Sequence, residues 1–272
     1  MRRLLSPKGL VGLVILVAVV AVAIGAPLLI PPSFGTRMQM ALRLRPPSAA
    51  HWLGTDQLGR DLFYRVLLGA RTSLTIAGAA VGMSILFGLP LGIVSGYFGG
   101  WADVALMRLV DTLLSFPALL LALTISAMLG PSLPNTIIAI GVAFTPFLAR
   151  IIRGEALRVA RMPYVEAARA SGTDHAGMIL RHVLPNVLPL VIVQGTISLA
   201  FAILAEAGLS FLGLGTQPPQ SSWGLMIQTS RDYLDVAPWT ALVPGAAVAL
   251  TVLALNMFGD VLRDTFDPRA RR

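Results

Sequence analysis

The sequence predicts an all-α polytopic membrane protein with six transmembrane helices. The chain has 272 residues, of which 56% are hydrophobic and only 12% are charged, whereas soluble domains usually carry about 25% charged residues. A helix needs about 20 mostly apolar residues to cross a bilayer. Six runs approach that length: Gly9–Ile30, Ser73–Tyr97, Leu109–Leu129, Asn135–Ile152, Val187–Leu209 and Thr240–Val261.

The first apolar run could be a cleaved signal peptide or a membrane anchor. The basic start of the chain, MRRLLSPKGL, suits both. The apolar part of a signal peptide is typically about 7–15 residues long. This run is longer, and it ends in APLLIPPSF without a convincing small-x-small cleavage site. We therefore expect an anchor that is not removed.

Six spans place both termini on one side of the membrane. With the termini inside, 14 lysines and arginines fall on the inner side and seven on the outer side. Because positive residues concentrate in cytoplasmic loops, both termini are expected in the cytoplasm. The predicted division is an anchor with an outer loop (residues 1–71), a core of five spans (72–265) and a basic tail (266–272).

The first outer loop is the weak point of this topology, because it holds six of the seven outer arginines. Part of it, DQLGRDLFYRVLLGARTS (Asp56–Ser73), carries its charges at helical spacing. It could be an amphipathic helix at the membrane interface or a solvated loop, and the sequence favours neither.

Small residues recur every four positions in parts of the second apolar run. Because such spacing lets helix backbones approach closely in lipid, we expect this face to pack against another helix. The residues are Gly78, Gly82, Gly88, Gly92 and Gly96. Prolines that can kink a helix lie in the second, third and fourth runs, at Pro90, Pro117 and Pro146.

The composition excludes several kinds of chemistry. The chain has no cysteine, so disulfides and thiolate sites are impossible. Its single lysine, Lys8, follows no G-x-x-x-x-G-K-[ST] loop, so the chain is not a P-loop ATPase by itself. No histidine lies in a predicted span and no G-x-S-x-G occurs, which disfavours an intramembrane serine enzyme. The basic residues lie in short loops rather than in clusters interleaved with aromatics, which disfavours nucleic-acid binding.

A polar insert separates the fourth and fifth apolar runs. Pro163 suits the first turn of a short helix, and Gly172 suits the left-handed residue that ends it. Thr173 or Asp174 can cap a second short helix, which we expect to end before Pro185. Two short helices around a glycine would form a compact knob that another protein can grip, whereas a solvated loop is the plainer alternative. His175 and His182 lie here without the further ligands that a metal site needs.

The insert resembles a known motif. Glu166-Ala167-Ala168, three residues, Gly172, nine residues and then His182-Val183-Leu184-Pro185 resembles the EAA loop of ABC importer permeases, E-A-A-x3-G-x9-I-x-L-P. His182 replaces the isoleucine of the general pattern, as in the similar dipeptide, oligopeptide and nickel branch. Segments His51–Leu74, Gly96–Ala122 and Leu209–Gly224 are also similar to that branch, and the resemblance, to its C-type subunit, covers residues from about 5 to 268.

The resemblance implies a type I ABC importer permease fold in a bacterial plasma membrane, with the coupling loop at about 155–185. It implies a homologous second permease subunit, separate ATPase subunits that hold ATP and Mg²⁺, and an extracytoplasmic substrate-binding protein. This chain would bind no cofactor and would have no enzymatic activity. The residues implied in coupling to the ATPase are Tyr164, Glu166, Ala167, Ala168, Gly172, Leu184 and Pro185.

Few ionisable residues lie inside the predicted spans. Glu206, with Ser210 one turn further, could face a translocation path, or it could make a structural hydrogen bond near the interface. Asp111 is expected to pair with Arg108. The resemblance implies di- or oligopeptide cargo, with nickel or another small solute as the alternative. A secondary transporter is disfavoured because no internal repeat is evident, and an interaction-only scaffold is a more distant alternative.

Overall fold

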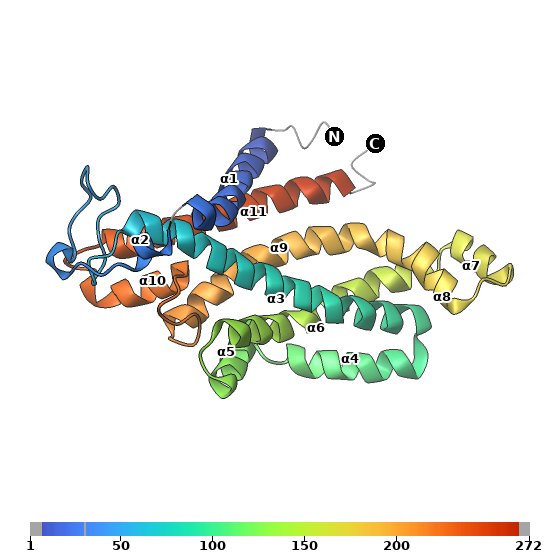
Figure 1. The fold of residues 1–272 in the computed structure, drawn as a ribbon. Helices are drawn as coiled ribbons and strands as arrows, with labels where there is room; N and C mark the ends of the chain where they lie inside the picture. The colour runs from blue at the N-terminus through green and yellow to red at the C-terminus, as the bar shows by residue number, and fades with distance from the viewer. Residues whose placement is uncertain (1–6, 30, 267–272) are drawn as a thin grey trace.

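The computed structural model describes residues 7–29 and 31–266, and these residues form an elongated helical bundle (Figure 1). Five helices are long and apolar enough to cross a membrane, and a bent pair makes a sixth candidate. The five are α1 (Pro7–Leu29), α3 (Leu62–Phe98), α6 (Leu133–Ala160), α9 (Leu184–Phe211) and α11 (Trp239–Phe266). The shorter helices are α2 (Pro32–Thr36), α4 (Gly100–Leu114), α5 (Ala118–Leu129), α7 (Pro163–Ala170), α8 (His175–Met178) and α10 (Trp223–Ser230).

The third span is a bent pair rather than one helix. Helices α4 and α5 meet at 84° across Ser115–Pro117, so the prediction of one helix over Leu109–Leu129 is wrong. Proline lacks the backbone N–H that a helix interior needs, and it disfavours the helical conformation of the preceding residue. Pro90 and Pro146, in contrast, lie within the continuous helices α3 and α6.

Ion pairs hold α4 against α6. Arg153 of α6 donates from Nε and Nη2 to the two carboxylate oxygens of Asp103 in α4, and both distances are 2.6 Å. Asp111 pairs with Arg150 of α6, so the expected partner, Arg108, is wrong. An arginine pairs most strongly through two parallel hydrogen bonds, and the Asp103 contact therefore fixes α4 alongside α6.

Glycines set the distance between α3 and α6. A Cβ atom built on Gly92 would lie 2.7 Å from the Ala149 carbonyl oxygen, and one on Gly96 would lie 2.5 Å from the Arg153 carbonyl oxygen. Gly88 is similarly close to α6, with a built Cβ 3.1 Å from the Thr145 carbonyl oxygen. The packing prediction is therefore confirmed for these three glycines.

The same prediction is wrong for Gly78 and Gly82 within this chain. Both are exposed, and a Cβ atom on either would meet nothing within 4 Å. The reason is helical geometry: at 3.6 residues per turn, the six residues between Gly82 and Gly88 turn the helix by about 600°, which leaves Gly82 about 120° around from Gly88.

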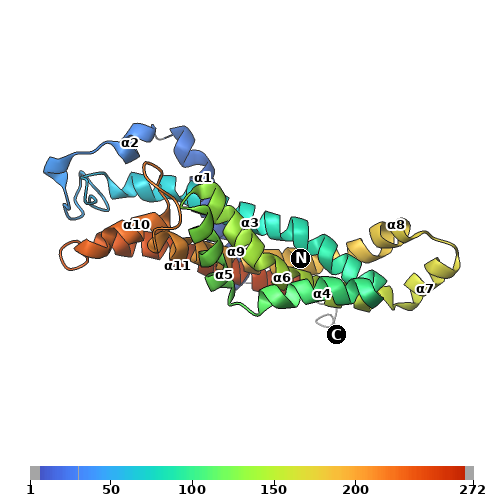
Figure 2. The same cartoon turned by 90° about the horizontal axis from the view of Figure 1, so that it is seen from below.

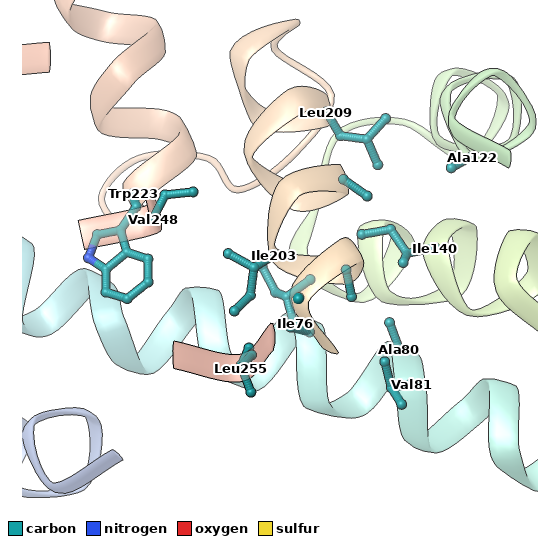
Figure 3. Close-up of a cluster of buried hydrophobic side chains, with 14 of the residues drawn as sticks. Ile76, Ala80, Val81, Ala122, Ile140, Ile203, Leu209, Trp223, Val248 and Leu255 are labelled. Atoms are coloured by element: carbon teal, nitrogen blue, oxygen red, sulfur yellow. The ribbon is translucent and has the colours of Figure 1, made fainter. Parts of the chain in front are cut away.

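The main hydrophobic cluster joins the centre of the bundle. Figure 3 shows side chains of this cluster, which come from α3, α5, α6, α9, α10 and α11. The cluster includes Ile76, Ala80, Ile140, Ile203, Leu209 and Leu255, all of them buried. Its many alanines let the helices approach closely, as in other membrane bundles.

One end of the bundle carries loops, and we call it the loop end. Asp56 is buried there: its carboxylate accepts a hydrogen bond from Arg60 Nε at 2.6 Å and lies 3.4 Å from Arg65 Nε. Helix α3 begins at Leu62, so the Asp56–Ser73 segment is neither a separate interfacial helix nor a wholly solvated loop. The predicted domain boundary at residues 71 and 72 falls inside α3.

The opposite end carries α7 and α8 (Figures 1 and 2). A cavity of about 580 Å³ lies near it, lined by Arg158 of α6, Asn186 of α9 and Arg263 of α11. These residues lie at the ends of three long helices, so the last turn of α11 is on the same side of the bundle as α7 and α8. Residues 1–6 and 267–272, including most of the predicted basic tail, lie outside the described residues.

Candidate functional site: the helical knob between α6 and α9

The polar insert folds as a knob of short helices, residues 163–183. Pro163 is the first residue of α7, as predicted. Gly172 follows α7 with φ +84°, a conformation that costs residues with a Cβ but not glycine. The Asp174 carboxylate then accepts a hydrogen bond from the Gly177 backbone N–H at 3.2 Å and caps α8. The local sequence therefore determines the turn between the two helices.

The second helix of the knob does not end before Pro185, so that prediction is wrong. Helix α8 continues through a π turn, Ile179–Val183, directly into α9. Proline cannot donate the backbone bond of a regular helix. Here Pro185 lies in the first turn of α9, after the π turn has already changed the bonding pattern. Helix α6 also extends to Ala160, beyond the predicted Ile152, so the insert is shorter than the predicted 155–185.

Hydrophobic contacts join the knob to three long helices. Val165 of α7 and Met178 of α8 have no exposed surface. They belong to a second buried cluster that includes Ile93 and Tyr97 of α3, Ile152 and Val159 of α6, and Val187 of α9. Burial of such side chains contributes about 1.5–3 kcal/mol each. A displacement of the knob therefore acts on α3, α6 and α9 together.

A polar contact reinforces this connection, and the sequence analysis missed it. Tyr97 Oη, at the end of α3, lies 2.9 Å from Nδ1 of His175, the first residue of α8. The Arg169 guanidinium lies over the Tyr97 ring, 5.7 Å from its centroid. Tyr97 precedes α7 by more than sixty residues, so no local spacing in the sequence could reveal the pair.

The residues predicted to couple to an ATPase lie together on the knob and at its junction with α9. Tyr164, Glu166, Ala167, Gly172 and Pro185 are exposed. Glu166 makes no ion pair with any described residue. The other two, Ala168 and Leu184, are half-buried against the second cluster. The exposed part of the knob thus combines small side chains with an unpaired acid.

Glu206 and Ser210 do not lie on an open path in this structure. Both are buried, with 0% and 1% exposure. The Glu206 carboxylate accepts hydrogen bonds from Ser210 Oγ at 2.8 Å and from Ser73 Oγ of α3 at 3.2 Å. Ser73 Oγ in turn accepts one from the backbone N–H of Trp223 in α10 at 3.1 Å. Glu206 thus makes the structural hydrogen bonds that the sequence offered as the alternative, and it joins α3, α9 and the start of α10. A role in the translocation path stays a prediction.

These features define a class of protein. Long apolar helices form a bundle of membrane-crossing length, and a rigidly attached helical knob projects from one end (Figure 1). Among the described residues, no group of three or more His, Asp or Glu side chains could hold a metal ion. The chain is a polytopic α-helical membrane component with an exposed contact element.

Comparison with known proteins specifies the family. Residues 88–272 match the family described as "Binding-protein-dependent transport system inner membrane component". The dipeptide transport system permease protein DppC of Alkalihalophilus pseudofirmus is 44% identical, covering 96% of this chain and 86% of that protein. The probable D,D-dipeptide transport system permease protein DdpC of Escherichia coli K12 is 44% identical over 86% of this chain and 78% of its own length. The chain belongs to this family and is a transport permease subunit.

Solved structures share the fold. The MetNI methionine ABC transporter, in an inward-facing conformation, matches 76% of this chain and 98% of its own chain with a TM-score of 0.61 and 18% identity. An amino acid ABC transporter matches 74% and 94%, with a TM-score of 0.58 and 16% identity. The fold is thus that of ABC importer permeases, as the EAA resemblance implied.

Proposed function

We propose that this chain forms one half of the translocation pathway of an ATP-driven importer of di- or oligopeptides. The relatives support peptide cargo: they include permeases named for dipeptides, for D,D-dipeptides and, at 41% identity in Pectobacterium atrosepticum, for glutathione. The branch that the sequence resembles also includes nickel permeases, so nickel is the competing cargo.

We infer that the knob is the site at which a separate ATPase subunit docks. The observation that carries this inference is the mechanical continuity of the knob with α3, α6 and α9 through one buried cluster. An ATPase that moves the exposed face of the knob would shift the ends of three long helices at once. Small side chains such as Ala167 allow close approach of a partner, and Glu166 offers a free carboxylate. Because an exposed ion pair contributes only about 0–1 kcal/mol, shape should matter more than this charge.

The energy source would lie in that partner. The only lysine, Lys8, follows no phosphate-binding loop, so ATP and Mg²⁺ would be held by the ATPase subunits and this chain would bind no cofactor. A homologous second permease would supply the other half of the pathway, and an extracytoplasmic binding protein would deliver the cargo at the loop end.

The proposed orientation has both termini and the knob in the cytoplasm of a bacterial cell. Two observations support it. The last turn of α11 lies near the knob end of the bundle, and the positive residues are concentrated on that side. The loop end would then face the outside.

Docking can be tested with one exposed alanine at each end. Ala167 of the knob and Ala49 of the loop end are both exposed, so tryptophan at either should leave the fold intact. We expect Ala167→Trp to lose co-purification of the ATPase and uptake, because the indole would separate the two surfaces. Ala49→Trp should retain the ATPase. Full ATPase recovery with Ala167→Trp would refute docking at the knob.

Cargo requires a separate assay. Cells that express the whole system should take up a labelled dipeptide in competition with unlabelled di- and tripeptides. Uptake of nickel that peptides do not compete with, together with no peptide uptake, would select the competing cargo and leave the docking result untouched.

A further inference from the structure

A groove opens between α1 and the rest of the bundle, away from the knob. Its volume is about 630 Å³, which lies within the range of about 300–1,000 Å³ that is usual for small-molecule sites. Helices α1, α3, α9 and α11 line it, mostly with aliphatic side chains that include Leu16, Ile24, Leu28, Leu199 and Leu255. Figure 1 shows α1 inclined to α11, which it contacts.

On the α3 side, the groove is lined by two polar residues followed by a glycine. Arg71, Thr75 and Gly78 all line it, and their spacing of four and three residues places them on one helix face. Arg71 is exposed and makes no hydrogen bond or ion pair with any described residue. Gly78 has no side chain to fill the space beneath it. The exposed glycine therefore keeps the groove open, in place of the helix packing that its spacing predicted.

Arg71 lies at the loop end of the groove. It shares the lining with Leu28, just beyond the most apolar stretch of α1, Gly9–Ala26. A charged side chain is costly at the centre of a bilayer and is tolerated near its boundary. The groove thus has an apolar body within the membrane and one unpaired guanidinium at its edge.

We propose that this groove binds one anionic phospholipid, with an acyl chain along α1 and the phosphate at Arg71. Arginine donates two parallel hydrogen bonds to a phosphate, and the Thr75 hydroxyl, one turn away, can donate another. Ile24 and Leu28 are 65% and 80% exposed, so an acyl chain there would cover apolar surface that the protein leaves open.

The length of the groove suits an acyl chain. The lining follows α1 from Leu16 to Leu28, about 18 Å at 1.5 Å per residue. One leaflet of a bilayer has a hydrocarbon depth of about 15 Å. The apolar part of the groove is therefore about as long as one acyl chain in a leaflet.

The test uses the intact transport complex and does not depend on the identity of its cargo. The complex is reconstituted into vesicles of phosphatidylcholine and phosphatidylglycerol in equal amounts. It is then re-extracted in detergent, and the retained lipid is identified by native mass spectrometry. The wild type should retain phosphatidylglycerol, and Arg71→Gln should retain at least about fivefold less of this lipid.

Matched variants separate the two parts of the site. Gly78→Leu should fill the groove and expel the lipid, and a Cβ atom built there meets nothing within 4 Å. Gly82→Leu, one turn away with equally open surroundings and outside the lining, should retain the lipid. Arg231→Gln removes an exposed arginine elsewhere at the loop end and should also retain it.

Three results would overturn the proposal. Equal phosphatidylglycerol retention by Arg71→Gln and the wild type would exclude the headgroup contact. Displacement of the lipid by inorganic phosphate alone would indicate a site for free anions. Failure of Gly78→Leu to assemble with the second permease, with lipid retention unchanged in Arg71→Gln, would show that a protein segment occupies the groove.

Discussion

Truncation of Met178 should loosen the knob without unfolding the bundle. Met178 ends α8, has no exposed surface and lies in the cluster that joins the knob to α3, α6 and α9. Replacement of a buried methionine by alanine costs about 2–5 kcal/mol through lost burial and the remaining cavity. Helices α7 and α8 have 8 and 4 residues, and helices this short have little stability of their own. The loss should therefore appear first as local opening.

Hydrogen exchange measured by mass spectrometry on the reconstituted complex would detect this opening. A loss of 2 kcal/mol corresponds to about 30-fold faster exchange of amides protected by that contact. Peptides within residues 163–183 should show it, and uptake per ATP hydrolysed should fall. Met226 of α10, 2% exposed, provides the control, because Met226→Ala removes the same atoms far from the knob. Unchanged exchange in residues 163–183 of Met178→Ala would refute the reasoning.

Further predictions concern the contacts described above. Tyr97→Phe keeps the ring but removes the hydroxyl beside His175. It should lower the stability of the knob by about 0.5–1.5 kcal/mol, measured as faster hydrogen exchange of α8 amides. Unchanged exchange of α8 would show that this contact does not stabilise the knob. Gly92→Leu should reduce the membrane level of the protein, because a Cβ would lie 2.7 Å from α6, whereas Gly82→Leu should accumulate normally in the same immunoblot. Glu206→Ala should lower the thermal unfolding midpoint, because it leaves buried hydroxyls unpaired at a cost of about 1–3 kcal/mol. Glu206→Gln keeps an acceptor and should lower the midpoint less. A midpoint of Glu206→Ala equal to that of the wild type would contradict the bridging role of Glu206.

The apolar runs predicted the spans well because lipid imposes a strong constraint. A backbone in hydrocarbon must satisfy its own hydrogen bonds, so a long apolar run becomes a helix. The same constraint ends where the membrane ends. Helix α3 begins at Leu62, eleven residues before the predicted Ser73. A helix can continue beyond the membrane into water, and an apolar run does not mark that part of the helix.

The knob was predictable where its structure is local. Pro163, Gly172 and Asp174 determine the start, the turn and the cap through contacts within a few residues. Contacts between distant segments were not predictable. The spacing that placed Asp111 near Arg108 could not reveal Arg150 of α6, which pairs with Asp111 in the structure.

The same limit applies to Glu206. An acid in an apolar run favours a functional role, but its partners Ser73 and Ser210 are ordinary in sequence. Only the packing of α3 against α9 shows that the carboxylate is enclosed. The assignment of the motif to ATPase docking remains a prediction that the experiment on Ala167 tests.

The uninterrupted helix from His175 to Phe211 has a mechanical consequence. Its 37 residues span about 55 Å, so it acts as a lever with one arm in the knob and the other beside Glu206. If the knob end of this helix were the pivot, a tilt of only about 5° would move its other end, beside Glu206, by about 5 Å. The π turn at Ile179–Val183 is the place where this lever could flex, and its stiffness would set how much of a push at the knob arrives at the loop end.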